Sequence, residues 1–275
     1  MIEAAMLLVA IGVADLARAP IANRAGSAAL GAVVGILVAV EGAVFAGAAP
    51  WASVVVGALL ALWLWAMTPA AGEAPARIWP GIVVLIAVAL AAVGLPAGGR
   101  PHPTVADWYA TTVPGQSGIG WTTAVVALGV VIFLLRSTNL LVRAAINSRA
   151  AARSSSMGGP GTRPVLPSGA EGWRVRIGRR PVADVERVAA SGRAAPQLVG
   201  GRVIGPIERL LLIGLGLAGG AAVIAALVAA KGVVRFPEIS ADRGTGANAE
   251  TFLVGSLTSW AVAAGGALLI WGTLG

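Results

Sequence analysis

Seven long runs of apolar residues limit what this chain can fold into. They cover residues 4–17, 27–49, 51–71, 80–97, 119–135, 207–230 and 250–272. A helix needs about 20 apolar residues to cross a bilayer, and a backbone in lipid must satisfy its own hydrogen bonds. The runs lack the alternation that a β-barrel requires. We therefore expect an all-α polytopic transmembrane helix bundle of about seven spans, the first of which is short, at about 14 residues.

The overall composition also indicates a lipid environment. Charged residues make up 12% of the chain and hydrophobic residues 57%, whereas a soluble domain carries about 25% charged residues. The absence of cysteine excludes disulfides, thiolate catalysis and cysteine–metal sites. A single histidine, His102, argues against a histidine-rich metal site. Because we find no catalytic motif, we expect a non-enzymatic protein without a cofactor.

Arginine residues predict the orientation of the chain. The segment 143–205 holds eleven arginines against three acidic residues, and loops rich in Lys and Arg stay in the cytoplasm. We expect a multi-pass protein of the bacterial plasma membrane, with a bundle at 1–142, a cytoplasmic loop at 143–205 and a two-helix hairpin at 206–275. This topology places the loop 231–249 outside, where its basic residues break the rule.

The basic loop is predicted to contain a linker followed by a small ordered element. Residues 149–172 are rich in Ser, Gly and Pro, which favours flexibility. Trp173, Val175 and Ile177 then alternate with arginines, which predicts a short strand, and 181–190 could form one or two helical turns. The candidate contacts for anions, either lipid headgroups or an acidic protein, are Arg174, Arg176, Arg179 and Arg180. Few aromatic residues are present to stack on bases, so we expect no nucleic acid.

Several charges fall within or beside the predicted spans, where they need partners. Glu41 is expected to pair with Lys231 or Arg235, which share a helix face; alternatively it is protonated and bonded to a carbonyl or a water. Asp15, Arg18, Glu208 and Arg209 could form a cluster at the inner end, or simply lie at headgroup level. The complete candidate charge network is Asp15, Glu41, Glu208, Arg209, Lys231, Arg235, Glu238 and Glu250.

Pairs of glycines four residues apart predict sites of close helix contact. Gly31 with Gly35, and Gly216 with Gly220, match the small-xxx-small pattern of membrane helices. Gly214, Gly216 and Gly219 also match a nucleotide-binding pattern, but they lie within an apolar run without a preceding strand, so we assign no nucleotide site.

Three C-terminal segments resemble a family of uncharacterised bacterial integral membrane proteins. They are GRVIGPIERLLLIGLGLAGG, AAKGVVRFPEI and AETFLVGSLTSW. The resemblance implies that Gly205, Glu208, Arg209, Lys231, Arg235, Glu238, Glu250, Gly255 and Ser259 are motif positions. STNLLVRAAI, from Ser137 onwards, belongs with them. The sequence departs from the family at Ile11, where members carry a histidine four residues before the position of Asp15. The resemblance implies no function.

Two functional hypotheses follow. The first is a non-enzymatic membrane scaffold or regulator whose arginine-rich loop contacts anionic lipid or an acidic partner. The alternative is a small transporter or channel that uses Glu41 with Lys231 and Arg235 as an ion-coupling site, because ionisable residues in membranes often mark such pathways. A third class, an intramembrane enzyme, would need a convergent acid, base and nucleophile, which the runs do not supply.

Overall fold

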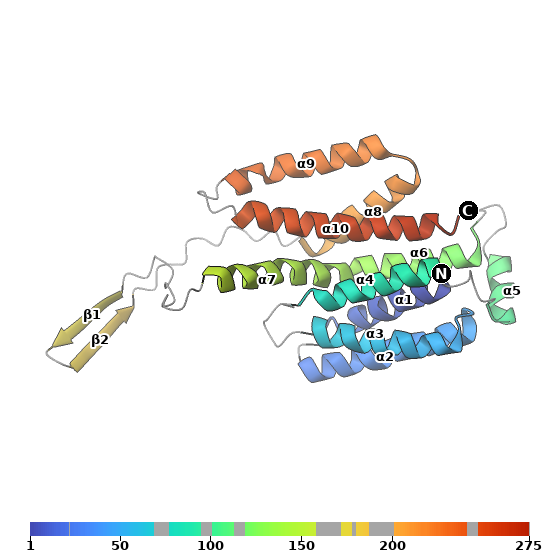
Figure 1. Ribbon diagram of the computed structural model, residues 1–275, viewed down its shortest axis with the longest axis horizontal. Helices are drawn as coiled ribbons and strands as arrows, with labels where there is room; N and C mark the ends of the chain where they lie inside the picture. The colour runs from blue at the N-terminus through green and yellow to red at the C-terminus, as the bar shows by residue number, and fades with distance from the viewer. Residues whose placement is uncertain are drawn as a thin grey trace.

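The computed structural model describes residues 1–21, 23–68, 77–94, 101–112, 119–157, 172–177, 180–186, 201–240 and 247–274. In these residues the chain forms ten helices and one β-hairpin (Figure 1). The helices are α1 (Ile2–Ala17), α2 (Arg24–Phe45), α3 (Pro50–Met67), α4 (Trp79–Gly94), α5 (Pro103–Thr112), α6 (Trp121–Leu135), α7 (Ser137–Met157), α8 (Gly201–Leu217), α9 (Ala221–Ser240) and α10 (Ala247–Trp271). The strands are β1 (Gly172–Ile177) and β2 (Arg180–Glu186). The predicted helical bundle is confirmed.

The first helix, α1, forms the centre of the bundle. It packs against α2, α3, α4 and α6, and Ile2, Ala10 and Ile11 are fully buried. A helix that is apolar on all sides suits such an enclosed position. Because α1 faces protein and not lipid, its short apolar run is long enough to hold the surrounding helices together.

Seven membrane spans are not supported. Three helices of the described residues are long and apolar enough to cross a membrane: Arg24–Phe45, Pro50–Met67 and Ala249–Trp271. The pair α6 and α7, bent by 48°, becomes a fourth span if it is taken as one helix. Helix α4, at 16 residues, is apolar but shorter. Sequence alone overestimates the number because an apolar run fits a buried helix as well as a lipid-facing one.

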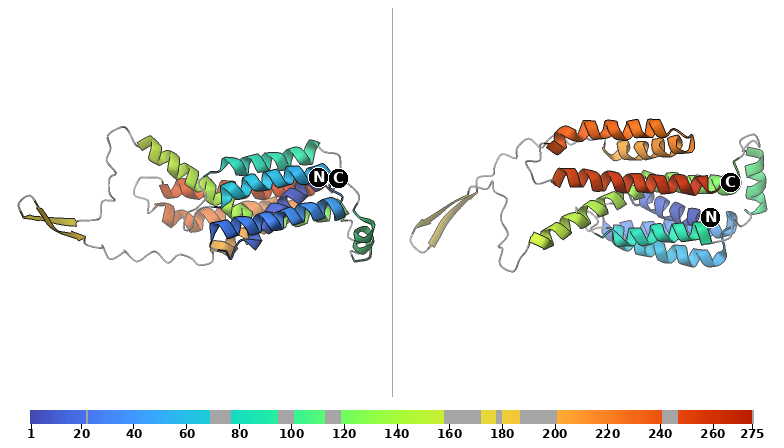
Figure 2. Two further views of the ribbon diagram at one scale, coloured as in Figure 1. Left: turned by 90° about the horizontal axis from the view of Figure 1, so that it is seen from below. Right: turned by 45° about the horizontal axis from the view of Figure 1, so that its top comes forward.

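The predicted span 207–230 is wrong, because the chain reverses direction within it. Helix α8 ends at Leu217, and α9 starts at Ala221 and runs back beside it (Figures 1 and 2). Gly219 makes the turn with φ of +75°, a backbone conformation that favours glycine. The Gly220 amide then bonds to the Leu215 carbonyl at 2.7 Å, which caps the end of α8.

The basic segment begins as helix and contains a β-hairpin. Helix α7 continues to Met157, so the predicted boundary at 142 falls inside a helix. The predicted strand over 173–177 is confirmed as β1, which pairs antiparallel with β2. The helical turns predicted after it are wrong, because Arg180–Glu186 form that second strand. The part of the predicted linker at 158–171, and Arg179, lie outside the described residues.

Glycines form close helix contacts at some of the predicted positions. Gly31 and Gly35 are buried, and a Cβ on Gly35 would lie 3.3 Å from the Ala10 carbonyl oxygen on α1. On α6, a Cβ on Gly129 would lie 2.8 Å from the carbonyl oxygen of Ala5, also on α1. The second predicted pair is wrong: Gly216 meets only one side-chain atom within 4.0 Å, so it lies at no helix contact.

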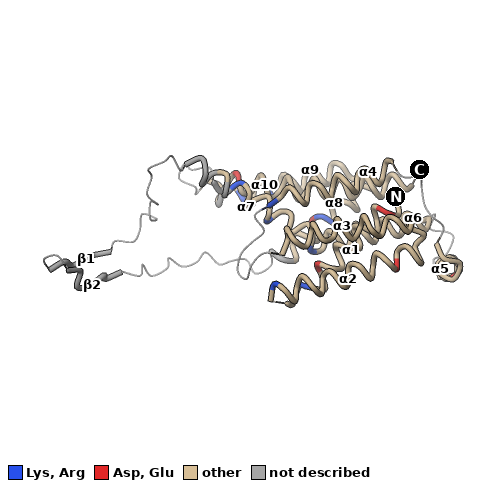
Figure 3. Tube along the Cα trace, turned by 60° about the horizontal axis from the view of Figure 1, so that its bottom comes forward, with Lys and Arg blue, Asp and Glu red and all other residues tan. Residues whose placement is uncertain are grey.

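Basic residues gather toward one end of the bundle (Figure 3). Arg24 begins α2, Arg149 lies in the second half of α7, and Lys231 and Arg235 lie in the second half of α9. These helix ends share the side from which α7 projects, whereas α5 and both termini lie at the other end (Figures 1 and 2). We call the side of α7 the basic end. Since α8 and α9 form a hairpin, Lys231 and Arg235 join the other basic residues there.

Candidate functional site: three charged clusters toward the basic end

The first cluster joins the last turns of α1 and α3. The Asp15 carboxylate accepts hydrogen bonds from Arg18 Nε at 2.8 Å and from Trp63 Nε1 at 3.0 Å. Arg18 also donates to the Thr68 hydroxyl and, at 3.2 Å, to the Met67 carbonyl at the end of α3. Asp15 is fully buried and Arg18 is only 5% exposed. The pair therefore fastens two helix ends inside the bundle.

The second cluster lies at the bend between α6 and α7. Arg209 of α8, 2% exposed, donates from Nη1 to the Leu134 carbonyl at 2.9 Å and from Nη2 to the Asn139 side-chain oxygen. Its Nε donates to the Gly205 carbonyl at 3.1 Å. A break in a helix leaves carbonyl groups without intrahelical donors, and an unbonded carbonyl in an apolar interior is costly. The guanidinium supplies those donors at the break.

The third cluster connects α8, α9 and α10. Lys231 Nζ lies 2.7 Å from both carboxylate oxygens of Glu208. The indole nitrogen of Trp260 donates to the same carboxylate at 2.9 Å, and the Lys231 ammonium lies 5.5 Å from the centre of the Trp260 ring. Lys231 is 29% exposed and Glu208 is 13% exposed. This is the most accessible of the three clusters, and its cation contacts both a carboxylate and an aromatic face.

The structure separates charges that the sequence placed together. The single inner cluster predicted from Asp15, Arg18, Glu208 and Arg209 is divided among the three clusters described above. The predicted partner of Lys231 is also wrong, because Lys231 bonds to Glu208 and not to Glu41. Glu41 is exposed on α2, which lies on the opposite side of the bundle from α9 (Figure 1). The ion-coupling site of the transport hypothesis therefore loses its central pair.

The remaining predicted residues are placed as follows. Glu250 lies in the first turn of α10, and Arg235 is exposed on α9. Glu238 belongs to α9, but its side chain lies outside the described residues. Three of the candidate anion contacts lie in the hairpin: Arg174 and Arg176 in β1, and Arg180 in β2.

Sequence reasoning missed the neutral partners of these charges. Trp63, Asn139 and Trp260 each bond to a charged side chain from a different helix. A deep tryptophan or asparagine in an apolar run is a weak signal, because a buried indole or amide needs a partner. The sequence does not reveal which helix carries that partner.

The three clusters are built for electrostatic fastening and not for bond chemistry. In the part of the chain that the structure describes, no three His, Asp or Glu side chains lie close enough to hold a metal ion. The two described carboxylates of the clusters, Asp15 and Glu208, each bond to a cation and to an indole nitrogen. The accessible charge of Lys231 is the feature that a ligand could contact.

Comparisons with known proteins provide no independent assignment. Neither the family models, nor the curated proteins, nor the solved structures match this chain. The resemblance of the C-terminal segments to a bacterial membrane family therefore stays a prediction. The functional argument rests on the geometry of the clusters and on the distribution of charge.

Proposed function

We propose that this chain is a non-enzymatic scaffold of the bacterial plasma membrane, whose basic end lies in the cytoplasm and binds anionic lipid headgroups. The observation that carries the proposal is the gathering of basic residues at one end of an apolar bundle (Figure 3). Cytoplasmic ends of membrane proteins are enriched in Lys and Arg, and the cytoplasmic leaflet carries anionic lipid. The β-hairpin adds three more arginines to the segment that follows α7.

The outer surface of the bundle supports a membrane location. On α2, Val33 and Leu37 are each 57% exposed, and on α4 Val93 is 89% exposed. Large contiguous apolar patches are rare on monomeric proteins in water. Three helices, or four with the bent pair, also have the length and hydropathy of membrane spans.

The orientation can be tested with single cysteines, because the natural chain has none. We expect cysteines at Arg149 and Ser240 to react with an impermeant maleimide only after the membrane is opened, and a cysteine at Leu274 to react in intact spheroplasts. All three side chains are exposed. If the cysteine at Ser240 reacted together with that at Leu274, both the folded-back hairpin and the orientation would be overturned.

Headgroup binding can be tested at the β-hairpin. Each basic residue near anionic lipid contributes about 1 kcal/mol, so three arginines contribute roughly 3 kcal/mol, or about a hundredfold in membrane association. A dye on Val175→Cys should be quenched by spin-labelled lipid in phosphatidylglycerol nanodiscs, and much less in phosphatidylcholine. The triple variant R174Q/R176Q/R180Q should lose this quenching, whereas Glu186→Gln should keep it. Equal quenching of the triple variant and the unsubstituted hairpin would contradict the proposal.

A further inference from the structure

An apolar groove separates the α8–α9 hairpin from α10. Its volume is about 670 Å³. The lining side chains include Leu212 on α8, Ile224 and Val228 on α9, and Trp260 and Ala267 on α10. The volume falls in the range typical of small-molecule sites, but the groove is too small for another helix, whose diameter with side chains is about 10 Å. A hydrocarbon chain is an occupant of suitable thickness and chemistry.

One end of the groove is charged. Ile224, Val228, Lys231 and Arg235 recur at helical spacing along one face of α9, so the face that lines the groove continues into two cations. Trp260 lines the groove, contacts the Lys231 ammonium with its ring and donates to Glu208. Glu208 takes two of the three hydrogens of that ammonium. The third remains for a ligand at a position that is 29% exposed.

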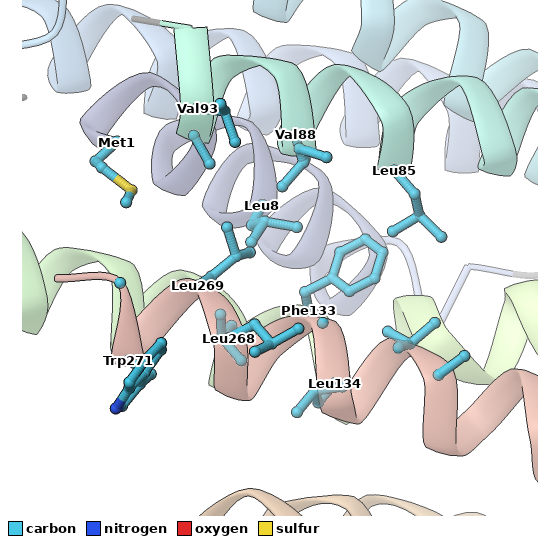
Figure 4. A pocket seen from close by; sticks show the side chains of 18 residues that line it. Met1, Leu8, Leu85, Val88, Val93, Phe133, Leu134, Leu268, Leu269 and Trp271 are labelled. Atoms are coloured by element: carbon cyan, nitrogen blue, oxygen red, sulfur yellow. The ribbon is translucent and has the colours of Figure 1, made fainter. Parts of the chain in front are cut away.

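A second groove, on the other side of α10, lacks this combination. It measures about 590 Å³ and lies between α1, α4, α6 and α10 (Figure 4). Its labelled side chains, among them Leu8, Val88, Phe133 and Leu269, are hydrocarbon throughout. Such a groove offers no group that would distinguish one lipid headgroup from another, so it carries no inference about selectivity.

We propose that the groove between the α8–α9 hairpin and α10 binds an anionic phospholipid, with an acyl chain along the groove and the phosphate at Lys231. Charge complementarity selects an anion, because Lys231 and Arg235 stand at the mouth and Glu208 offsets one of them. Trp260 marks the boundary between the two regions, a place that its amphipathic ring favours. The inference rests on the proposed membrane location, but not on headgroup binding by the β-hairpin.

Two glycines on α8 provide a matched pair of variants. Gly216 lines the groove, and a Cβ there would meet only Ile224 Cδ1 at 4.0 Å, so Gly216→Phe fills the groove without a backbone clash. Gly214 lies two residues away, outside the groove lining, and has nothing within 4 Å of its Cβ position. Gly214→Phe therefore adds the same side chain to the same helix while leaving the groove open.

The test is native mass spectrometry of the full chain after release from nanodiscs that contain dioleoyl phosphatidylglycerol. We expect a retained lipid, reduced at least tenfold by Gly216→Phe and by Lys231→Met, and unchanged in Gly214→Phe. The double variant E208Q/K231M, which leaves no unpaired carboxylate, should behave like Lys231→Met. Dihexanoyl phosphatidylglycerol, with the same headgroup and short chains, and dioleoyl phosphatidylcholine should both be retained poorly.

Three results would overturn the inference. One is equal lipid retention in Gly216→Phe and Gly214→Phe, which would place the lipid elsewhere. Another is retention of phosphatidylcholine to the same extent as phosphatidylglycerol, with no effect of Lys231→Met. A third is loss of the lipid in R174Q/R176Q/R180Q but not in the groove variants; it would assign binding to the β-hairpin and leave the proposed function standing.

Discussion

The buried ion pair between Asp15 and Arg18 provides the sharpest test of how this bundle is held together. Asp15→Asn keeps the shape of the side chain and removes its negative charge. Arg18, 5% exposed, would then keep its bonds to Thr68 and Met67 but lose its counter-charge. Removing one member of a buried ion pair costs about 3–5 kcal/mol of unfolding free energy. A loss of that size is a large fraction of the stability of a domain.

A double-mutant cycle separates the pair from its surroundings. Arg18→Met should cost a similar amount, because it leaves the fully buried Asp15 without its cation. With both charges removed, the double variant D15N/R18M should be more stable than the sum of the single effects predicts, by about 2–3 kcal/mol. The matched control is Glu41→Gln, the same change from carboxylate to amide on the exposed face of α2, which should stay within about 0.5 kcal/mol.

The assay is unfolding by dodecyl sulfate in mixed dodecylmaltoside micelles, followed by tryptophan fluorescence. Trp63 is a direct reporter, because its indole nitrogen donates to Asp15 at 3.0 Å. The reasoning is refuted if Asp15→Asn costs less than about 1 kcal/mol, or if the two single effects simply add. Either result would mean that water or lipid headgroups solvate these charges despite their burial.

Three further predictions concern packing and the turns. Gly12→Val should destabilise the bundle by about 1–3 kcal/mol, because its Cβ would lie 3.0 Å from the backbone of Ile132, whereas Gly57→Val, with nothing within 4 Å, should be neutral in the same unfolding assay. Arg209→Met should cost about 3 kcal/mol by leaving carbonyls at the α6–α7 bend without donors, and exposed Arg143→Met should not. Gly219→Ala should cost about 1–2 kcal/mol, because φ of +75° is strained for any residue with a Cβ; an unchanged stability would show that the turn relaxes.

Local patterns predicted local structure well. The alternation at Trp173, Val175 and Ile177 predicted β1, because a strand's period of two is visible in the residues themselves. Glu250 was correctly placed in the first turn of α10. The spacing of Gly31 and Gly35 correctly predicted a close contact, because small residues on one face of an apolar helix let another backbone approach.

Non-local features were harder to predict. The run 207–230 has the length of a span, and nothing in its composition requires that Gly219 should adopt a positive φ while Gly214 remains helical. The pairing of Lys231 with Glu208 depends on that reversal, since it brings the middle of α9 back beside the start of α8. An error in one turn therefore moved both the predicted partner of Lys231 and the predicted side of the loop 231–249.

The sequence by itself determined that the chain is helical, apolar and basic in one segment, because these properties follow from composition and from short-range periodicity. Only the tertiary structure decided which apolar runs are enclosed by protein, where the chain reverses, and which charges meet. The physical reason is that lipid and a packed protein interior are nearly equal solvents for an aliphatic side chain. The choice between them is made by the neighbouring helices and their few polar contacts.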